Sequence, residues 1–117
     1  MANRHKAAGT RWESAVVAYL REGDPTAVDV RRVAQTGRVD IGDVHAYPFA
    51  VECKAERTFR LAEYIREAER EADAAGMPYG VAVVKARGRP VAEGYVVMSL
   101  ATFRRLLRDL RDRPDDM

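Results

Sequence analysis

The pattern of hydrophobic and polar positions along the chain predicts three amphipathic helices. The first spans Lys6 to Arg21, and the apolar residues that recur at helical spacing are Trp12, Ala15, Val16, Tyr19 and Leu20. The second spans Leu61 to Ala75 and ends at Gly76. Its expected buried stripe is Leu61, Ile65, Ala68 and Ala72. The third begins after Ser99, a favourable N-cap, and its apolar stripe is Phe103, Leu106, Leu107 and Leu110.

Five segments between these helices have the pattern of strands. The expected strands are Val28 to Val33, Val39 to Ala46, Phe49 to Ala55, Gly80 to Val84 and Gly94 to Met98. A turn centred between Tyr47 and Pro48 joins the second strand to the third. The resulting order, α-β-β-β-α-β-β-α, predicts an α/β (α+β) fold with a central mixed sheet flanked by helices.

Length and composition indicate one soluble domain. A chain of 117 residues fits a single domain, expected over residues 1–112, with a frayed tail at residues 113–117. No apolar run approaches the length of a membrane span, and the start lacks the apolar core of a secretory signal. We therefore expect a cytoplasmic protein with no membrane partner. The single cysteine, Cys53, excludes an internal disulfide and a cysteine-based zinc cluster.

Candidate chemistry is concentrated between Asp43 and Lys54. In a strand, residues two apart share a face, so Glu52 and Lys54 project together while Val51 and Cys53 face the core. A turn between Tyr47 and Pro48 places Asp43 opposite Glu52, with Cβ atoms about 4.5–5.5 Å apart. Two such carboxylates can hold a hard divalent cation, beside a lysine that contacts a phosphate or water. The pattern is typical of a phosphodiesterase site.

Two further acids are candidates for the same site. Asp40 would oppose Ala55 and by parity point to the other face, so Asp43 is preferred and Asp40 is the reserve ligand. Glu13 borders the apolar face of the first helix, from which it could reach the sheet and complete the metal site. Taken by itself, an ordinary surface glutamate is the preferred interpretation of Glu13.

The net charge of +2 hides a more basic surface. Much of the acid lies in the second helix, at residues 63–73, and the candidate metal ligands would be offset by a cation. Basic residues flank the proposed site and are consistent with phosphate contacts: Arg31, Arg32, Arg38, Arg57, Arg60, Lys85, Arg87 and Arg89.

The segments Gly9 to Glu13, Thr36-Gly37, Asp43 and Glu52-Cys53-Lys54 together resemble the PD-(D/E)XK nuclease superfamily. Within it, the chain is most similar to archaeal-type Holliday junction resolvases and their phage-encoded relatives, over roughly residues 4 to 87. The resemblance implies a restriction-endonuclease-like core.

The resemblance also implies roles for individual residues. Glu13, Asp43 and Glu52 would ligate Mg²⁺ or Mn²⁺, Lys54 would orient or activate the attacking water, and Thr36 would lie near the scissile phosphate. The chain departs from the family in having Gly42 where proline often precedes the aspartate. It also has Glu67 or Glu69 in the region where many relatives have a glutamine, and we favour plain surface charge for that acid.

These observations favour a metal-dependent, structure-selective DNA endonuclease that cuts four-way or other branched junctions. DNA contacts are expected at Arg31, Arg32, Thr36, Arg38, Lys85 and Arg87. The alternatives are a related nuclease that cuts flaps, ends or specific sites, a non-catalytic DNA-binding module of the same fold, and a protein with a chance motif. Two symmetric cuts would need a homodimer. The last helix or a strand edge could form the interface, but packing of that helix on the sheet is the preferred expectation.

Overall fold

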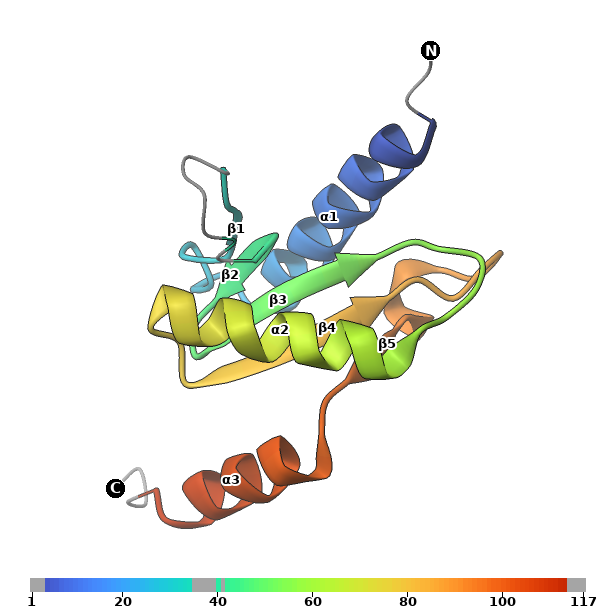
Figure 1. Cartoon of the computed structure of the whole chain (residues 1–117). Coiled ribbons are helices and arrows are strands. Elements are labelled where there is room, and N and C mark those ends of the chain that lie inside the picture. Colours follow the sequence, from blue (N-terminus) through green and yellow to red (C-terminus); the bar gives the residue numbers. More distant parts are fainter. Residues whose placement is uncertain (1–3, 35–39, 41, 114–117) are drawn as a thin grey trace.

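A five-stranded mixed sheet forms the centre of the fold, shown in Figure 1 for a computed structural model that describes residues 4–34, 40 and 42–113. The strands follow one another across the sheet as β1 (Arg31–Arg32), β2 (Val44–Ala46), β3 (Phe49–Lys54), β4 (Tyr79–Val84) and β5 (Tyr95–Val97). The central pair, β3 and β4, is parallel, and the other neighbouring strands are antiparallel.

Three helices complete an α+β architecture and confirm the predicted order of elements. They are α1 (Arg4–Gly23), α2 (Leu61–Ala75) and α3 (Leu100–Arg111), and a short 3₁₀ helix, η1 (Val91–Glu93), precedes β5. The bounds of α2 are those predicted, because Gly76 ends the helix in the left-handed conformation that glycine adopts readily. The Ser99 hydroxyl accepts a hydrogen bond from the backbone N–H of Thr102, which confirms the predicted N-cap of α3.

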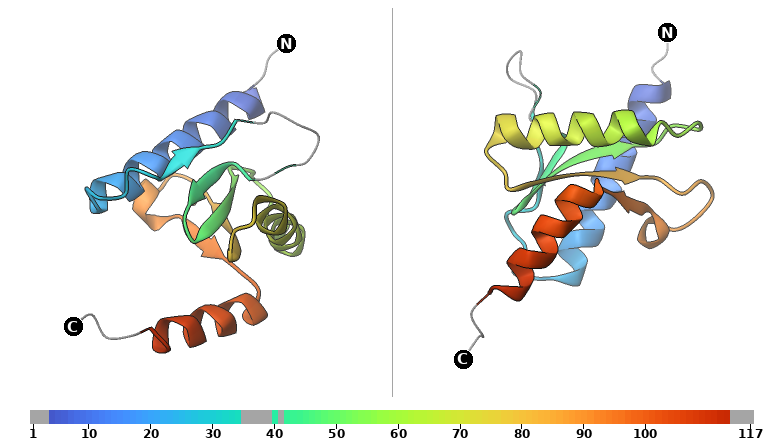
Figure 2. Two further views of the ribbon diagram at one scale, coloured as in Figure 1. Left: turned by 90° about the vertical axis from the view of Figure 1, so that its left-hand side faces the viewer. Right: turned by 60° about the horizontal axis from the view of Figure 1, so that its bottom comes forward.

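The two faces of the sheet carry different cores, because α1 and α2 lie on opposite sides of it (Figure 2). On the α1 face, Trp12 and Val16 pack with Val51 and Cys53 of β3, and the indole Nε1 donates to the carbonyl oxygen of Val83 at 3.0 Å. On the other face, the buried ring of Tyr64 packs on Ala82 and Val84 of β4.

The hairpin of β2 and β3 has the predicted register. Its pairs are Val44 with Val51, His45 with Ala50 and Ala46 with Phe49, which centres the turn between Tyr47 and Pro48. Every residue of β3 is therefore placed on the face expected from alternation.

Two predicted strands lose most of their length in the structure, and two others lose one or two residues at their ends. The strand expected over Val28 to Val33 shrinks to β1, because hydrogen-bonded turns occupy residues 24–30 and the Arg21 guanidinium binds the Val30 carbonyl. Of the strand expected over Val39 to Ala46, the described residues form only β2. Gly42 has φ of 102° and its N–H donates to the Asp40 side chain, so the chain bends before Val44.

The expected packing of α3 on the sheet is wrong. Its residues Phe103, Leu107 and Leu110 are exposed, and Leu106 is half-buried. Instead the polar residue Thr102 is buried. Of the predicted C-terminal tail, only Arg113 belongs to the described residues.

None of the helices in the described ranges is long and apolar enough to span a membrane.

We expect Gly80→Ala to lower the free energy of unfolding by about 1–3 kcal/mol. A Cβ atom at Gly80 would lie 2.2 Å from the backbone oxygen of Ala68, so α2 would have to move away from β4. Urea denaturation measures the change. The matched control is Gly9→Ala, where no atom lies within 4 Å of the added carbon and the helix gains propensity. Equal stability of Gly80→Ala and the wild type would contradict the tight approach.

Candidate metal centre

Glu52 lies at the middle of a group of charged side chains beneath α2. It is only 6% exposed, and its Oε2 lies 3.0 Å from the Nζ of Lys54. The neighbours Val51 and Cys53 join the core against α1, as predicted from strand alternation. A carboxylate in this setting has lost most of its hydration, so its stability in the fold depends on its polar partners.

Asp43 stands beside Glu52 directly before β2. Its backbone N–H donates to the Val51 carbonyl at 3.0 Å, and its Oδ2 accepts from the backbone N–H of Cys53 at 2.8 Å. The two bonds fix the side chain against β3. Burial and then the negative charge of Glu52 raise the pKa of Asp43 to about 7.

Asp40 also lies on this side, contrary to the prediction from strand parity. One ligand oxygen from each of Asp40, Glu52 and Glu71 falls within 4.8 Å of the other two. Parity fails because the chain is not a strand here: the Asp40 Oδ1 accepts from the N–H of Gly42 at 3.0 Å, and the positive φ of Gly42 turns the backbone. Both aspartates therefore lie near Glu52.

Glu71 is the acid that the sequence analysis missed. It is 3% exposed on the inner side of α2, where the buried residues are Tyr64, Ala68, Glu71 and Ala72. The predicted stripe began at Leu61, which is exposed. A stripe counted from Tyr64 reaches Ala68 and Glu71 at helical spacing, and this was the signal available in the sequence.

The two glutamates considered for a fourth acid have other partners. Glu67 Oε1 lies 2.9 Å from Lys54 Nζ, and Glu69 Oε2 accepts from the Thr102 hydroxyl at 3.3 Å. Both glutamates are half-exposed and neither belongs to the group formed by Asp40, Glu52 and Glu71, as the preference for surface charge over a fourth metal ligand expects.

Within the described part of the chain, two oxygens of the centre have no hydrogen-bond partner. They are Oε1 of Glu52 and Oε1 of Glu71, both buried. Burial, together with the nearby Glu52 and Asp40 carboxylates, raises the pKa of Glu71. Buried unpaired carboxylate oxygens are costly, and hard divalent cations prefer such ligands. The donor set therefore fits Mg²⁺ or Mn²⁺.

Lys54 is held as an ammonium ion at the side of this centre. Burial alone would lower the pKa of Lys54, but hydrogen bonds to Glu67 and Glu52 raise it above its ordinary value. The ammonium also lies 5.2 Å from the centre of the Tyr64 ring. These contacts favour a fixed positive charge over a general base.

Glu13 lies at the rim of the centre. Its Oε1 pairs with the Nε of Arg32 at 3.1 Å, and its negative charge contributes to the raised pKa of Asp43. It does not belong to the close group formed by Asp40, Glu52 and Glu71. A cation bound to that group would be reached by Glu13 only after a change in its pairing with Arg32.

A basic groove of about 1170 Å³ runs beside Lys54. We define it by its charged lining residues Arg11, Lys54, Glu56, Arg57, Arg60 and Arg87. Arg60 pairs with Glu56 and Glu63, whereas Arg11, Arg57 and Arg87 add positive charge from α1 and from the loops after β3 and β4. Arg11 was not among the predicted DNA contacts.

The predicted DNA contacts fall in three places. Lys85 and Arg87 lie in or next to the basic groove, in a hollow that also includes Gly88. Arg31 and Arg32 form the edge strand β1, where Arg32 is engaged by Glu13. Thr36 and Arg38 lie outside the described residues.

The chain matches no protein-family model, no curated protein and no solved structure.

We expect the metal-free protein to lose thermal stability as the pH rises from about 5 to about 8. Asp43 and Glu71 have raised pKa values, so the native state binds more protons than the unfolded state, and stability falls as these groups ionise. For Asp43 the loss runs from its ordinary pKa of 3.8 up to about 7, above which the carboxyl group is ionised in both states. Millimolar Mg²⁺ should restore the melting temperature at the alkaline end and change little at the acid end. Scanning fluorimetry with chelator or Mg²⁺ measures this, and a melting temperature that ignores both pH and Mg²⁺ would refute the expectation.

Proposed function

We propose that the chain is a metal-dependent DNA endonuclease with a restriction-endonuclease-like core of the PD-(D/E)XK type. The observation that carries the proposal is the pair of buried, unpartnered oxygens on Glu52 and Glu71 beside two aspartates. The Nζ of Lys54 lies 3.0 Å from Oε2 of Glu52. A positive charge at this place would stabilise the negative charge that develops on the phosphate during hydrolysis.

Glu52, Asp43, Asp40 and Glu71 would hold the cation. Glu52 would be the central ligand, because its carboxylate interacts with those of Asp43 and Glu71 and lies near that of Asp40. When bound, Mg²⁺ (or Mn²⁺) would supply a coordinated water of lowered pKa and positive charge beside the phosphate. Glu13 would join from α1 once Arg32 turns to the substrate.

Lys54 would stabilise the charge that develops on the phosphate oxygens. A cation shared with Glu52 would weaken the hold of that carboxylate on the ammonium, leaving Nζ free to contact phosphate or to orient the attacking water. Glu67 would keep the ammonium in position from α2.

The basic groove supports nucleic acid as the substrate. It begins at Lys54 and continues past Arg57 to Arg11 and Arg87, so a phosphate placed at the metal centre has further cationic side chains along its strand. A small phosphodiester would not need this extension.

The branched substrate, the homodimer and the cytoplasmic location come from the sequence and its resemblance to junction resolvases, and they are part of the proposal. Paired cuts across a four-way junction need two centres related by symmetry. Flap, end or site-specific cleavage remains the alternative within the same chemistry. A non-catalytic DNA-binding module would keep the basic groove and lack cleavage.

The decisive variant is Glu52→Gln. We expect Mg²⁺-dependent cleavage of a four-way junction to fall at least about a hundredfold, while DNA binding persists. The metal-free variant should be as stable as the wild type or more so, because one of the adjacent buried carboxylates is gone. Gel cleavage assays, filter binding and melting curves give the three readouts. The control is Glu22→Gln, an exposed glutamate near the end of α1 that lines neither the acidic centre nor the basic groove.

Three outcomes of this assay separate the candidate functions. Unchanged cleavage by Glu52→Gln would remove the proposed mechanism. Wild-type binding without any cleavage in Mg²⁺ or Mn²⁺ would indicate the non-catalytic module. A junction, a flap and a linear duplex tested side by side decide the substrate, since equal rates on all three would reject junction selectivity.

We expect Arg57→Ala and Arg87→Ala each to weaken DNA binding and to make it less dependent on salt. Each lost phosphate contact should lower the slope of log K against log salt by about 0.9 for duplex DNA. Fluorescence anisotropy with the Glu52→Gln protein measures binding without cleavage. Arg89→Ala is the matched control, because Arg89 is paired with Glu93 at 2.6 Å. Unchanged slopes for both groove variants would place the DNA elsewhere.

A further inference from the structure

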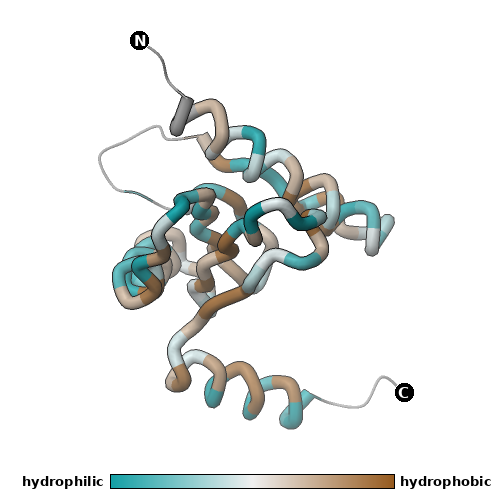
Figure 3. The backbone as a smooth tube through the Cα atoms, turned by 90° about the vertical axis from the view of Figure 1, so that its right-hand side faces the viewer, coloured by the Kyte–Doolittle hydropathy of each residue, from teal (hydrophilic) through white to brown (hydrophobic). Residues whose placement is uncertain are grey.

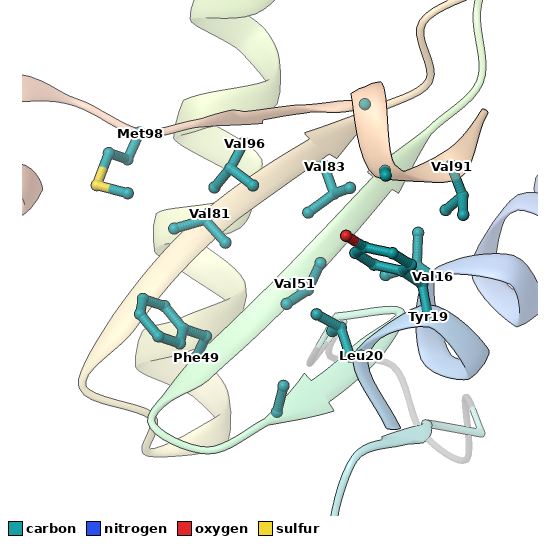
Figure 4. A pocket seen from close by; sticks show the side chains of 13 residues that line it. Val16, Tyr19, Leu20, Phe49, Val51, Val81, Val83, Val91, Val96 and Met98 are labelled. Carbon is teal, nitrogen blue, oxygen red and sulfur yellow. The ribbon is translucent and has the colours of Figure 1, made fainter. Parts of the chain in front are cut away.

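A second, apolar groove of about 360 Å³ opens on the α1 face of the sheet (Figure 4). We define it by Tyr19 and Leu20 of α1 with Phe49, Val83, Val96 and Met98 on the sheet side. Tyr19, Leu20 and Val96 are among the exposed large hydrophobic residues, so this part of the described surface is left uncovered by the chain itself.

The helix α3 carries an exposed apolar stripe that also lacks a cover. Leu100, Phe103, Leu107 and Leu110 follow helical spacing and are 81%, 49%, 39% and 54% exposed. Figures 1 and 3 show α3 standing apart from the sheet, with hydrophobic residues along it.

Polar contacts hold α3 in this orientation. The Thr102 hydroxyl binds Glu69, the Arg105 guanidinium donates to the Pro78 carbonyl, and the Tyr79 hydroxyl binds Asp109. These residues lie on the side of α3 that faces its own chain. The apolar stripe therefore faces away from its own chain and does not contact the apolar groove of that chain.

We propose that the stripe of α3 docks into the apolar groove of a second copy of this chain, reciprocally, about a two-fold axis. Each chain carries both halves of the contact, which is the requirement for a closed, self-complementary dimer. The two halves adjoin along the sequence, since Met98 lines the groove and α3 begins at Leu100.

The exposed area of the chain is consistent with a missing partner. The structure exposes 8228 Å², whereas a compact monomer of 13.1 kDa is expected to expose roughly 6,400 Å². The difference of about 1,800 Å² also counts the residues outside the described ranges. Within the described ranges, Leu100, Phe103 and Val96 are 81%, 49% and 62% exposed. A stable interface buries about 800 Å² on each partner, and these residues would supply its apolar part.

This inference is independent of the proposed nuclease chemistry. The groove lies on the α1 face, whereas Glu52 and Glu71 lie beneath α2 on the other face. The shift in melting temperature that Mg²⁺ produces tests the metal centre in any oligomeric state.

Sedimentation equilibrium on the full chain at micromolar concentration tests the dimer. We expect a wild-type dimer, and we expect Phe103→Glu and Val96→Glu each to raise its dissociation constant at least about a hundredfold by placing a charge in the apolar contact. Both positions are about half exposed or more, so the variants should fold, which circular dichroism checks. Leu107→Glu and Leu20→Glu are second variants for the same two surfaces. Arg104→Glu, an exposed residue outside the stripe on α3, is the control and should leave the dimer intact.

Mixing the two charged variants distinguishes reciprocal docking from other contacts. A Phe103→Glu chain keeps its groove and a Val96→Glu chain keeps its helix, so the mixture should form a heterodimer through one intact contact, weaker than the wild type. A wild-type monomer would overturn the proposal. A dimer broken by Phe103→Glu but not by Val96→Glu or Leu20→Glu would also overturn it, since the helices would then pair with each other.

Discussion

The close burial of Glu52 and Glu71 under α2 is the constraint on which the site depends. Two carboxyl groups that have lost their hydration and share a small volume cannot both ionise at low cost. Lys54 pairs with one oxygen of Glu52, and burial beside Glu52 raises the pKa of Glu71, so a proton on Glu71 offsets part of the repulsion. Among the described residues, Oε1 of each glutamate has no other hydrogen-bond partner. A divalent cation would satisfy both oxygens at once, and the proposed metal site rests on this argument.

The surrounding fold keeps these groups from moving apart. Gly80 lets the backbone of α2 approach β4, and this approach sets the depth at which Glu71 enters the centre. The backbone N–H of Asp43 donates to the Val51 carbonyl, and the Asp43 carboxylate accepts from the N–H of Cys53. These two hydrogen bonds hold Asp43 against β3. The carboxylates could move apart only if α2 left β4 or if Asp43 lost its hydrogen bonds to β3. Binding a proton or a cation would reduce their repulsion at a lower cost in free energy.

The sequence predicts what depends on local rules. Alternation and turn chemistry were enough for the register about Tyr47 and Pro48, for the shared face of Glu52 and Lys54, and for the end of α2 at Gly76. The errors concern features that depend on tertiary structure. Strand parity misplaced Asp40 because the bend at Gly42 is not a strand, and Glu71 was overlooked because a glutamate on a helix is usually solvated. The stripe of α3 is visible in the sequence, but what covers it is not.

The basic groove and the apolar groove lie at different places along α1, so a ligand in one would not block the other. Arg11 lines the basic groove and Leu20 lines the apolar groove, nine residues apart, or about 13 Å along the helix. Trp12, bonded to the Val83 carbonyl, holds α1 to the sheet between them. A second copy in the apolar groove would leave the basic groove and the acidic centre open, and the two-fold axis would present two such centres together. Cation binding would offset the repulsion among the buried carboxylates, and dimer formation would cover the exposed apolar residues of α3 and of the apolar groove.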